Sequence, residues 1–195
     1  LAVCLCAHAE VKLPAIFSDG MVMQQQTKAN LWGTATPNKK ITVTTGWNGK
    51  QYVATADKNG AWKLSVSTPE AGGPYSITFN DGSKKTLNNI LIGELWLCSG
   101  QSNMEMPMKG FKNQPVENAN MDILRSKNPN IRLFTVKRTS TFTPQTDVVG
   151  TWKEATPANV RDFSATAYYF GRLINEMFLW DWWSPLGAVR LARHG

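Results

Sequence analysis

Residues 91–104 read LIGELWLCSGQSNM, an apolar run that passes directly into a polar turn. The continuous apolar part, residues 91–98, is typical of a strand covered on both faces of an α/β sheet. Gly100 allows the chain to turn sharply without a clash from a Cβ atom. Ser102 is then predicted to lie at the carboxyl end of this strand, where open α/β sheets place their ligand-binding crevice. If a helix begins there, its first N–H groups are free to hold a developing oxyanion.

The residue types alone leave two interpretations of Ser102 open. A strand followed by Gly-x-Ser-Asn is the layout of a nucleophile turn, and it is also the layout of an ordinary surface turn. Gln101 and Asn103 flank the serine, where their side chains either stabilise the turn or help to bind an acyl oxygen. A serine hydroxyl attacks an ester only with a base within hydrogen-bond reach. The two histidines of the sequence are His8 and His194.

Three blocks of the sequence resemble the sialate O-acetylesterase family, a branch of the SGNH-hydrolase superfamily. They are residues 13–25 (LPAIFSDGMVMQQ), 93–104 (GELWLCSGQSNM) and 163–172 (FSATAYYFGR), within a resemblance that covers residues 12–177. The resemblance implies a serine esterase without cofactor or metal, which removes acetyl groups from an O-acetylated sugar or glycan. Ser102 is the implied nucleophile and its backbone N–H a candidate oxyanion donor. The implied sugar is either sialic acid or a plant polysaccharide such as xylan.

The catalytic histidine of the family comes from an Asp-x-x-His block that this sequence does not match, because no acidic residue precedes His194 within residues 190–195. The chain is therefore expected to be an incomplete, nearly inactive fragment of an esterase when assayed with p-nitrophenyl acetate. The alternative comes from another functional class. In it, the protein is a glycan-binding accessory protein with a β-sandwich and a vestigial esterase half-domain.

Residues 178–195 differ in composition from the rest of the chain, since three of its eight tryptophans lie at positions 180, 182 and 183. Codons read from the third base of the Phe178 codon permit Pro-Leu-Gly-Leu-Val-Val-Ser-Ser-Trp-Gly-Gly. That stretch is similar to the family block that contributes to the oxyanion site. The sequence therefore predicts an out-of-frame tail at 178–195 and a truncated chain, with a genuine divergent tail as the alternative.

The chain before this tail is predicted to have a mixed fold in two parts. In residues 10–90, the runs 41–44, 51–55, 62–66 and 75–79 alternate apolar with polar residues, and Asn-Gly or Asp-Gly pairs lie between or after them. This pattern is typical of an antiparallel β-sandwich. Residues 91–177 are predicted to begin an α/β, SGNH-hydrolase-like (flavodoxin-like) domain, with helices at 116–126 and 163–177 and a strand at 131–136.

Residues 1–9 form an apolar run that ends in Ala7-His8-Ala9, the cleavage pattern of a secretory signal. We interpret them as a residual signal peptide and expect an exported protein, periplasmic or extracellular. A buried first strand and a lipid-anchored cysteine are the alternatives. No later apolar run reaches the length of about 18 residues that spans a membrane.

The composition favours a globular protein without a nucleic-acid partner. The net charge is +7, but the basic residues are scattered and match no nucleic-acid motif. Cys98 is interpreted as a packing residue, and Glu105 and Asp162 as surface acids. The tryptophans of the first part, Trp32, Trp47 and Trp62, are interpreted as core or cross-strand residues, with a sugar-binding platform as the alternative.

Overall fold

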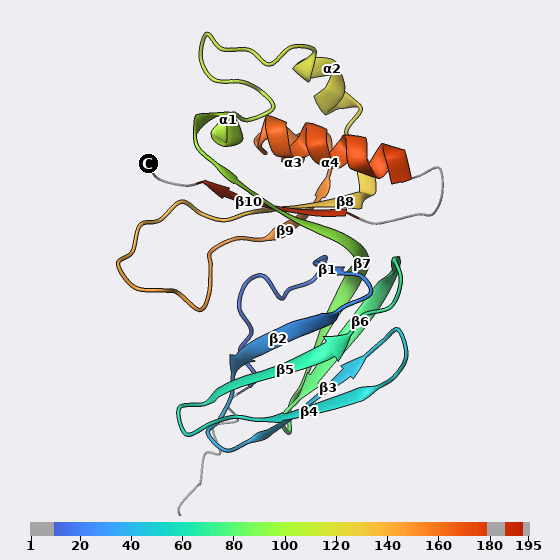
Figure 1. Cartoon of the computed structure of the whole chain (residues 1–195), viewed down its shortest axis with the longest axis vertical. Helices are drawn as coiled ribbons and strands as arrows, with labels where there is room; N and C mark the ends of the chain where they lie inside the picture. Colours follow the sequence, from blue (N-terminus) through green and yellow to red (C-terminus); the bar gives the residue numbers. More distant parts are fainter. Residues whose placement is uncertain (1–9, 179–185, 193–195) are drawn as a thin grey trace, which may run out of the picture.

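The computed structural model describes residues 10–178 and 186–192 (Figure 1). The predicted signal peptide, residues 1–9, lies outside the described residues, as do both histidines. Of the predicted out-of-frame tail, residues 179–185 and 193–195 also lie outside them. The reading frame of the tail stays a prediction.

The described chain contains ten strands and four helices. The strands are β1 (Val22–Gln24), β2 (Lys28–Thr34), β3 (Lys40–Thr45), β4 (Gln51–Thr55), β5 (Ala61–Ser67), β6 (Gly72–Asn80), β7 (Lys84–Gly100), β8 (Asn128–Thr135), β9 (Trp152–Ala155) and β10 (Leu186–Ala192). The helices are α1 (Ser102–Glu105), α2 (Ala119–Leu124), α3 (Pro157–Val160) and α4 (Ala165–Phe178). The four alternating runs of the first part are found as β3, β4, β5 and β6, which confirms those strands.

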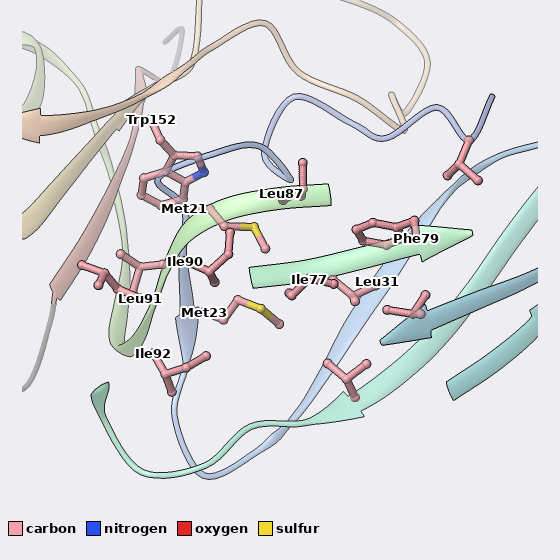
Figure 2. Packing of buried hydrophobic residues seen from close by; sticks show 14 of the residues in the cluster. Met21, Met23, Leu31, Ile77, Phe79, Leu87, Ile90, Leu91, Ile92 and Trp152 are labelled. Carbon is pink, nitrogen blue, oxygen red and sulfur yellow. The ribbon is translucent and has the colours of Figure 1, made fainter. Parts of the chain in front are cut away.

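The first half consists of two antiparallel layers over one core. One layer contains β4, β3, β6 and the start of β7 in that order, and the other contains β2 and β5. Leu31 and Val66 from the two-stranded layer are fully buried with Ile41 and Phe79 of the larger layer. Figure 2 shows Leu31 and Phe79 in this core. The alternating pattern arises because every second side chain of these strands enters this core.

Strand β7 belongs to both halves of the molecule. Its first part is antiparallel to β6, residues 91–93 pair in parallel with β1, and residues 94–100 pair in parallel with β10. The predicted domain boundary near residue 90 therefore falls inside one continuous strand (Figure 1). The two halves are joined by sheet backbone at this point and not by a linker.

The second half continues the sheet in the order β7-β10-β8-β9, with β9 antiparallel. The helices lie on the side of this sheet away from β2 and β5 (Figure 1). Strand β10, between β7 and β8, was not predicted, because residues 186–192 were assigned to the out-of-frame tail. Gly187 is buried there, and a Cβ atom at this position would come within 2.8 Å of Val22 Cβ. The mixed character of the fold agrees with the prediction.

Parts of the second half differ from the sequence prediction. The expected helix at 116–126 is shortened to α2, because Asn118 adopts a left-handed conformation (φ 56°) and interrupts the helical backbone. Helical spacing predicts an apolar stripe on the helix at 163–177, formed by Phe163, Ala167, Phe170, Ile174 and Met177. Phe163 and Ala167 are buried as expected, but Phe170 and Met177 are exposed, and Tyr168 and Asn175 are buried instead. Asn175 faces inward because its side-chain oxygen accepts a hydrogen bond from Asn128 Nδ2 at 3.0 Å.

The expectation that residues 91–98 are covered on both faces is wrong for their second part. Residues 91–93 are buried, but Leu97 is 66% exposed. Trp96 packs edge-to-face against Phe170 of α4, with ring centroids 4.9 Å apart. The described residues place helices on one face of β7 only, so the side chain pointing to the other face meets solvent. Among the described residues, none of the helices has the length and apolarity that crossing a membrane requires.

Candidate active site

Ser102 lies where the prediction placed it, at the carboxyl end of β7. The strand ends at Gly100, and Ser102 is the first residue of the single-turn helix α1. The carbonyl of Gln101 accepts hydrogen bonds from the N–H groups of Met104 and Glu105, both at 3.0 Å. Ser102 is exposed, and so are Gln101 and Asn103. The serine is therefore open to a ligand and is not a core residue.

The flanking residues differ in how they contribute to the turn. A Cβ atom on Gly100 would lie 3.1 Å from Met104 Cβ, so the small residue suits the close approach of α1 to the strand. The side chain of Gln101 makes no capping hydrogen bond to α1. The Asn103 carbonyl, by contrast, accepts a hydrogen bond from Thr166. The Gln101 side chain therefore does not stabilise the turn by capping α1.

The block at 163–172 packs directly against the Ser102 turn. Thr166 Oγ1 donates to the carbonyl of Asn103 at 3.0 Å, and the Ala165 N–H donates to the Met106 carbonyl at 2.8 Å. The hydroxyl of Ser164, fully buried, lies 3.3 Å from the sulfur of Met104. The start of α4 thus holds α1 in place. This role was missed in the sequence, because periodicity shows a buried helix face and not its partner.

A Thr166→Val variant is expected to loosen the Ser102 turn. It keeps the side-chain shape and removes one hydrogen bond, worth about 0.5–1 kcal/mol. Amide exchange of Met104 and Met106, measured by NMR or mass spectrometry, should accelerate about two- to fivefold through easier local opening. Thr151→Val is the control, because the described residues give its hydroxyl no hydrogen bond. Equal exchange in both variants would show that Thr166 does not hold the turn.

The block at 13–25 supports the middle of β7. Strand β1 lies in this block, and its Gln24 side chain accepts a hydrogen bond from the Leu95 N–H at 2.9 Å. Gln24 and Gln25 also donate to the two carboxylate oxygens of Glu94, at 3.1 and 2.7 Å. All three sequence blocks therefore converge on the strand and turn that carry Ser102.

The two acids interpreted as surface residues both form ion pairs. Glu105 of α1 contacts Arg138 at 3.1 Å, which ties the Ser102 turn to the segment after β8. Asp162 pairs with Lys109 and lies near Arg161, and the hydrogen bond from Lys109 lowers the pKa of the Asp162 carboxyl. Asp162 is exposed, as expected, whereas Glu105 is half-buried. Neither of these ion pairs includes Ser102.

A hydrogen-bonded cluster joins α2 to α4. Asp122 accepts hydrogen bonds from Arg172 Nη1 and from the Tyr169 hydroxyl, each at 2.7 Å. The bond from Arg172, followed by that from Tyr169, lowers the pKa of the Asp122 carboxyl. Burial, with the neighbouring Asp122, raises the pKa of Tyr169 to about 12. Tyr169 therefore stays protonated and Asp122 charged near neutral pH, which keeps the cluster intact.

An Asp122→Asn variant is expected to lose about 1–2 kcal/mol of stability at pH 7, because hydrogen bonds to a charged group are lost at a partly exposed site. Since the folded pKa of Asp122 lies below its ordinary value of 3.8, the contribution is present above pH 4 and disappears as the pH falls through the lowered pKa. Urea unfolding at pH 7 and pH 3 measures both effects. Glu176→Gln, which alters an exposed partner of Arg172, is the control. A deficit equal at both pH values would contradict the assignment.

The other candidate nucleophile is Cys98, and its position favours packing. Cys98 is buried in the second-half core, and burial raises the pKa of its thiol. A protonated buried thiol is a poor nucleophile. Residues 10–178 and 186–192 include no histidine, so a histidine base for Ser102 has to come from elsewhere.

Comparison with known proteins supports the resemblance seen in the three blocks. No protein-family model matches the sequence. Sialate O-acetylesterases of Pongo abelii and Mus musculus are each 26% identical to the chain, covering 91% and 87% of it. A solved carbohydrate acetylesterase from Xanthomonas citri matches 94% of the chain with a TM-score of 0.84 and 30% identity.

The chain is similar to sialate O-acetylesterases over most of its length, and its structure is similar to that of a carbohydrate acetylesterase. It spans 36% and 33% of the length of the Pongo abelii and Mus musculus family members, about a third. It covers 40% of the Xanthomonas citri chain. The family matches thus include both halves of the fold described above and the Ser102 turn between β7 and α1.

Proposed function

We propose that the protein is a carbohydrate O-acetylesterase that uses Ser102 as its nucleophile. The observation that carries this proposal is the position of Ser102, exposed on the first residue of α1 at the carboxyl end of β7. The likeness to named sialate O-acetylesterases and to a carbohydrate acetylesterase supports the same chemistry. The substrate class is an O-acetylated sugar, either sialic acid or a xylan-type polysaccharide.

In the proposed reaction, Ser102 Oγ attacks the acetyl carbonyl carbon and transfers its proton to a base. The ester bond to the sugar oxygen breaks, the base gives the serine proton to that oxygen so that the sugar hydroxyl is released, and an acetyl-serine remains. Water then cleaves this ester to give acetate and free Ser102. The Ser102 N–H is the proposed donor to the oxyanion, with Gln101 and Asn103 as candidates for a further contact. The described residues contain no histidine, so a histidine base for this step comes from outside them.

The finer assignment of the fold is part of the same proposal. We place residues 10–90 in a β-sandwich domain, and residues 91–177 at the start of an SGNH-hydrolase-like, flavodoxin-like domain. A parallel β7-β10-β8 arrangement with helices on one face supports this assignment. We also propose that the protein is exported, on the pattern Ala7-His8-Ala9.

The test measures acetate released from O-acetylated sialic acid and from acetylated xylan. Both the 195-residue chain and the protein encoded by the gene, resequenced through the Phe178 codon and beyond, are assayed. Acetate release identifies the sugar. Failure of both proteins to release acetate from either sugar and from p-nitrophenyl acetate would refute the esterase proposal.

A further inference from the structure

A groove of about 730 Å³ lies over the outer face of the two-stranded layer, away from the core. Residues of β2 and β5 form its floor, segment 12–14 forms one wall, and Thr146 and Asp147 from the β8–β9 connection form another. The volume falls within the range of about 300–1,000 Å³ that is usual for ligand sites. The groove thus combines parts of both halves of the molecule.

The floor of the groove is concave because the large Trp32 ring lies among small residues. Trp32 lies on the outer face of β2, next to Gly33 and Thr34, and Thr34 pairs across the layer with Ala61. All four residues line the groove. Toward Thr34 and Ala61 the indole ring therefore has only small neighbours, whereas the long side chain of Lys63 lies on the residue directly opposite it.

The Trp32 ring is held in a fixed orientation before any ligand arrives. Its Nε1 donates to the carbonyl of Thr146 at 3.2 Å, and Phe17 packs edge-to-face with a centroid distance of 4.5 Å. Asp147 fixes the same wall, because its Oδ1 accepts the backbone N–H of Ala15 at 2.8 Å. A preorganised aromatic surface loses little conformational entropy on binding.

Polar groups surround this ring. Lys63 pairs directly opposite Trp32 in the layer, and Lys12 lines the same groove. The Asn30 oxygen accepts a hydrogen bond from Ser65 at 2.7 Å, so its NH2 group is the one offered to a ligand. The lining therefore joins the half-exposed Trp32 ring to hydrogen-bond donors on two lysines and Asn30, and to one acceptor, Asp147.

We propose that this groove is a glycan-binding site in which Trp32 stacks on the apolar face of a pyranose ring. The ring's hydroxyl groups accept hydrogen bonds from Lys63 and Asn30. This inference rests on the proposed carbohydrate esterase function, which supplies the ligand class, and it adds a site that Ser102 does not contact. Two lysines beside an aspartate do not form the continuous basic stripe that a nucleic acid needs.

The site refines the earlier expectation about the tryptophans. Trp62 borders the groove but is 3% exposed, so it is a core residue. Trp47 donates to the Ser67 carbonyl at 3.1 Å, packs against Tyr75 and does not line the groove. Of the three, Trp32 alone is both half-exposed and part of the lining. A platform of three rings is therefore replaced by a single stacking residue.

The test is calorimetric titration of the whole 195-residue chain with xylohexaose and with 3′-sialyllactose. Trp32→Ala is expected to weaken binding at least about tenfold, equivalent to about 1.4 kcal/mol. Trp96→Ala is the matched control, because it removes a 38% exposed tryptophan from the other half. Trp32→Phe keeps an aromatic ring and should retain part of the affinity, which guards against a folding defect in Trp32→Ala.

The outcomes separate this site from the esterase centre. Unchanged affinity in Ser102→Ala, with loss in Trp32→Ala, supports the groove whether or not the protein releases acetate. The sugar that binds identifies the glycan source. Binding of neither sugar by the folded chain would overturn the proposal, as would equal affinity of Trp32→Ala and Trp96→Ala.

Discussion

A Ser102→Ala variant should lose nearly all of the acetylesterase activity that the parent protein shows. Removal of a serine nucleophile eliminates the covalent step, and in serine hydrolases this costs about 10³- to 10⁶-fold in kcat. The fall should appear in kcat and not in KM, because the hydroxyl is used in bond making. Steady-state hydrolysis of p-nitrophenyl acetate measures both constants.

The matched control for this variant is Ser140→Ala. Ser140 is an exposed serine in the segment between β8 and β9, so its loss removes the same atom outside the proposed reaction centre. Ser102 is also exposed, so neither variant opens a cavity, and both should keep the melting temperature within the range usual for surface substitutions. Comparable activity of the two variants would exclude Ser102 as the nucleophile.

The local sequence pattern was sufficient to predict a strand and its buried face where both follow from the same alternation of apolar and polar residues. In β3 and β6, alternation placed Ile41 and Phe79 in the core, and both are fully buried. The turns were predictable for a similar reason, because the glycine of each Asn-Gly or Asp-Gly pair marks a turn locally. Gly49, Gly60 and Gly82 all adopt positive φ between strands. The turn after β7 was equally local, because Gly100 and Ser102 follow the apolar run directly.

Long-range contacts explain most of what pattern did not predict. On α4, 3.6-residue spacing fits more than one face, and the buried face is chosen by partners such as Asn128, which lies 47 residues from Asn175. Strand β10 depends on two distant neighbours, β7 and β8. The support given to the Ser102 turn by Thr166 spans 63 residues. The sequence of a single segment does not show which distant segment it will contact.

The groove over Trp32 was visible in the sequence only as an open alternative. The sequence shows tryptophans on separate strands, but the wall formed by Thr146 comes from a polar segment with no periodicity. Trp32 and Thr146 lie 114 residues apart, and their contact defines the site. Residue type thus indicated a possible sugar contact, and tertiary structure selected which tryptophan has the required surroundings.

Trp152 joins the two halves of the molecule. It begins β9 in the second half, yet it packs in the core cluster of the first half, close to Met21 (Figure 2). The ring is 6% exposed and lies 5.2 Å from the Phe134 ring, and Nε1 donates to the Ile16 carbonyl at 2.8 Å. Trp152 is therefore a packing residue at the junction of the two halves.

A Trp152→Ala variant is therefore expected to lose about 3–5 kcal/mol of unfolding free energy, the usual cost of deleting a buried large aromatic side chain. Trp152→Phe should lose less than half of this, because it keeps most of the packing and gives up the hydrogen bond to Ile16. Urea unfolding followed by circular dichroism measures both. Phe142→Ala, which removes a fully exposed ring, should stay within about 0.5 kcal/mol of the parent. If Trp152→Ala were as stable as Phe142→Ala, the junction would have to be held by the continuous β7 backbone and its strand pairing instead of by this side chain.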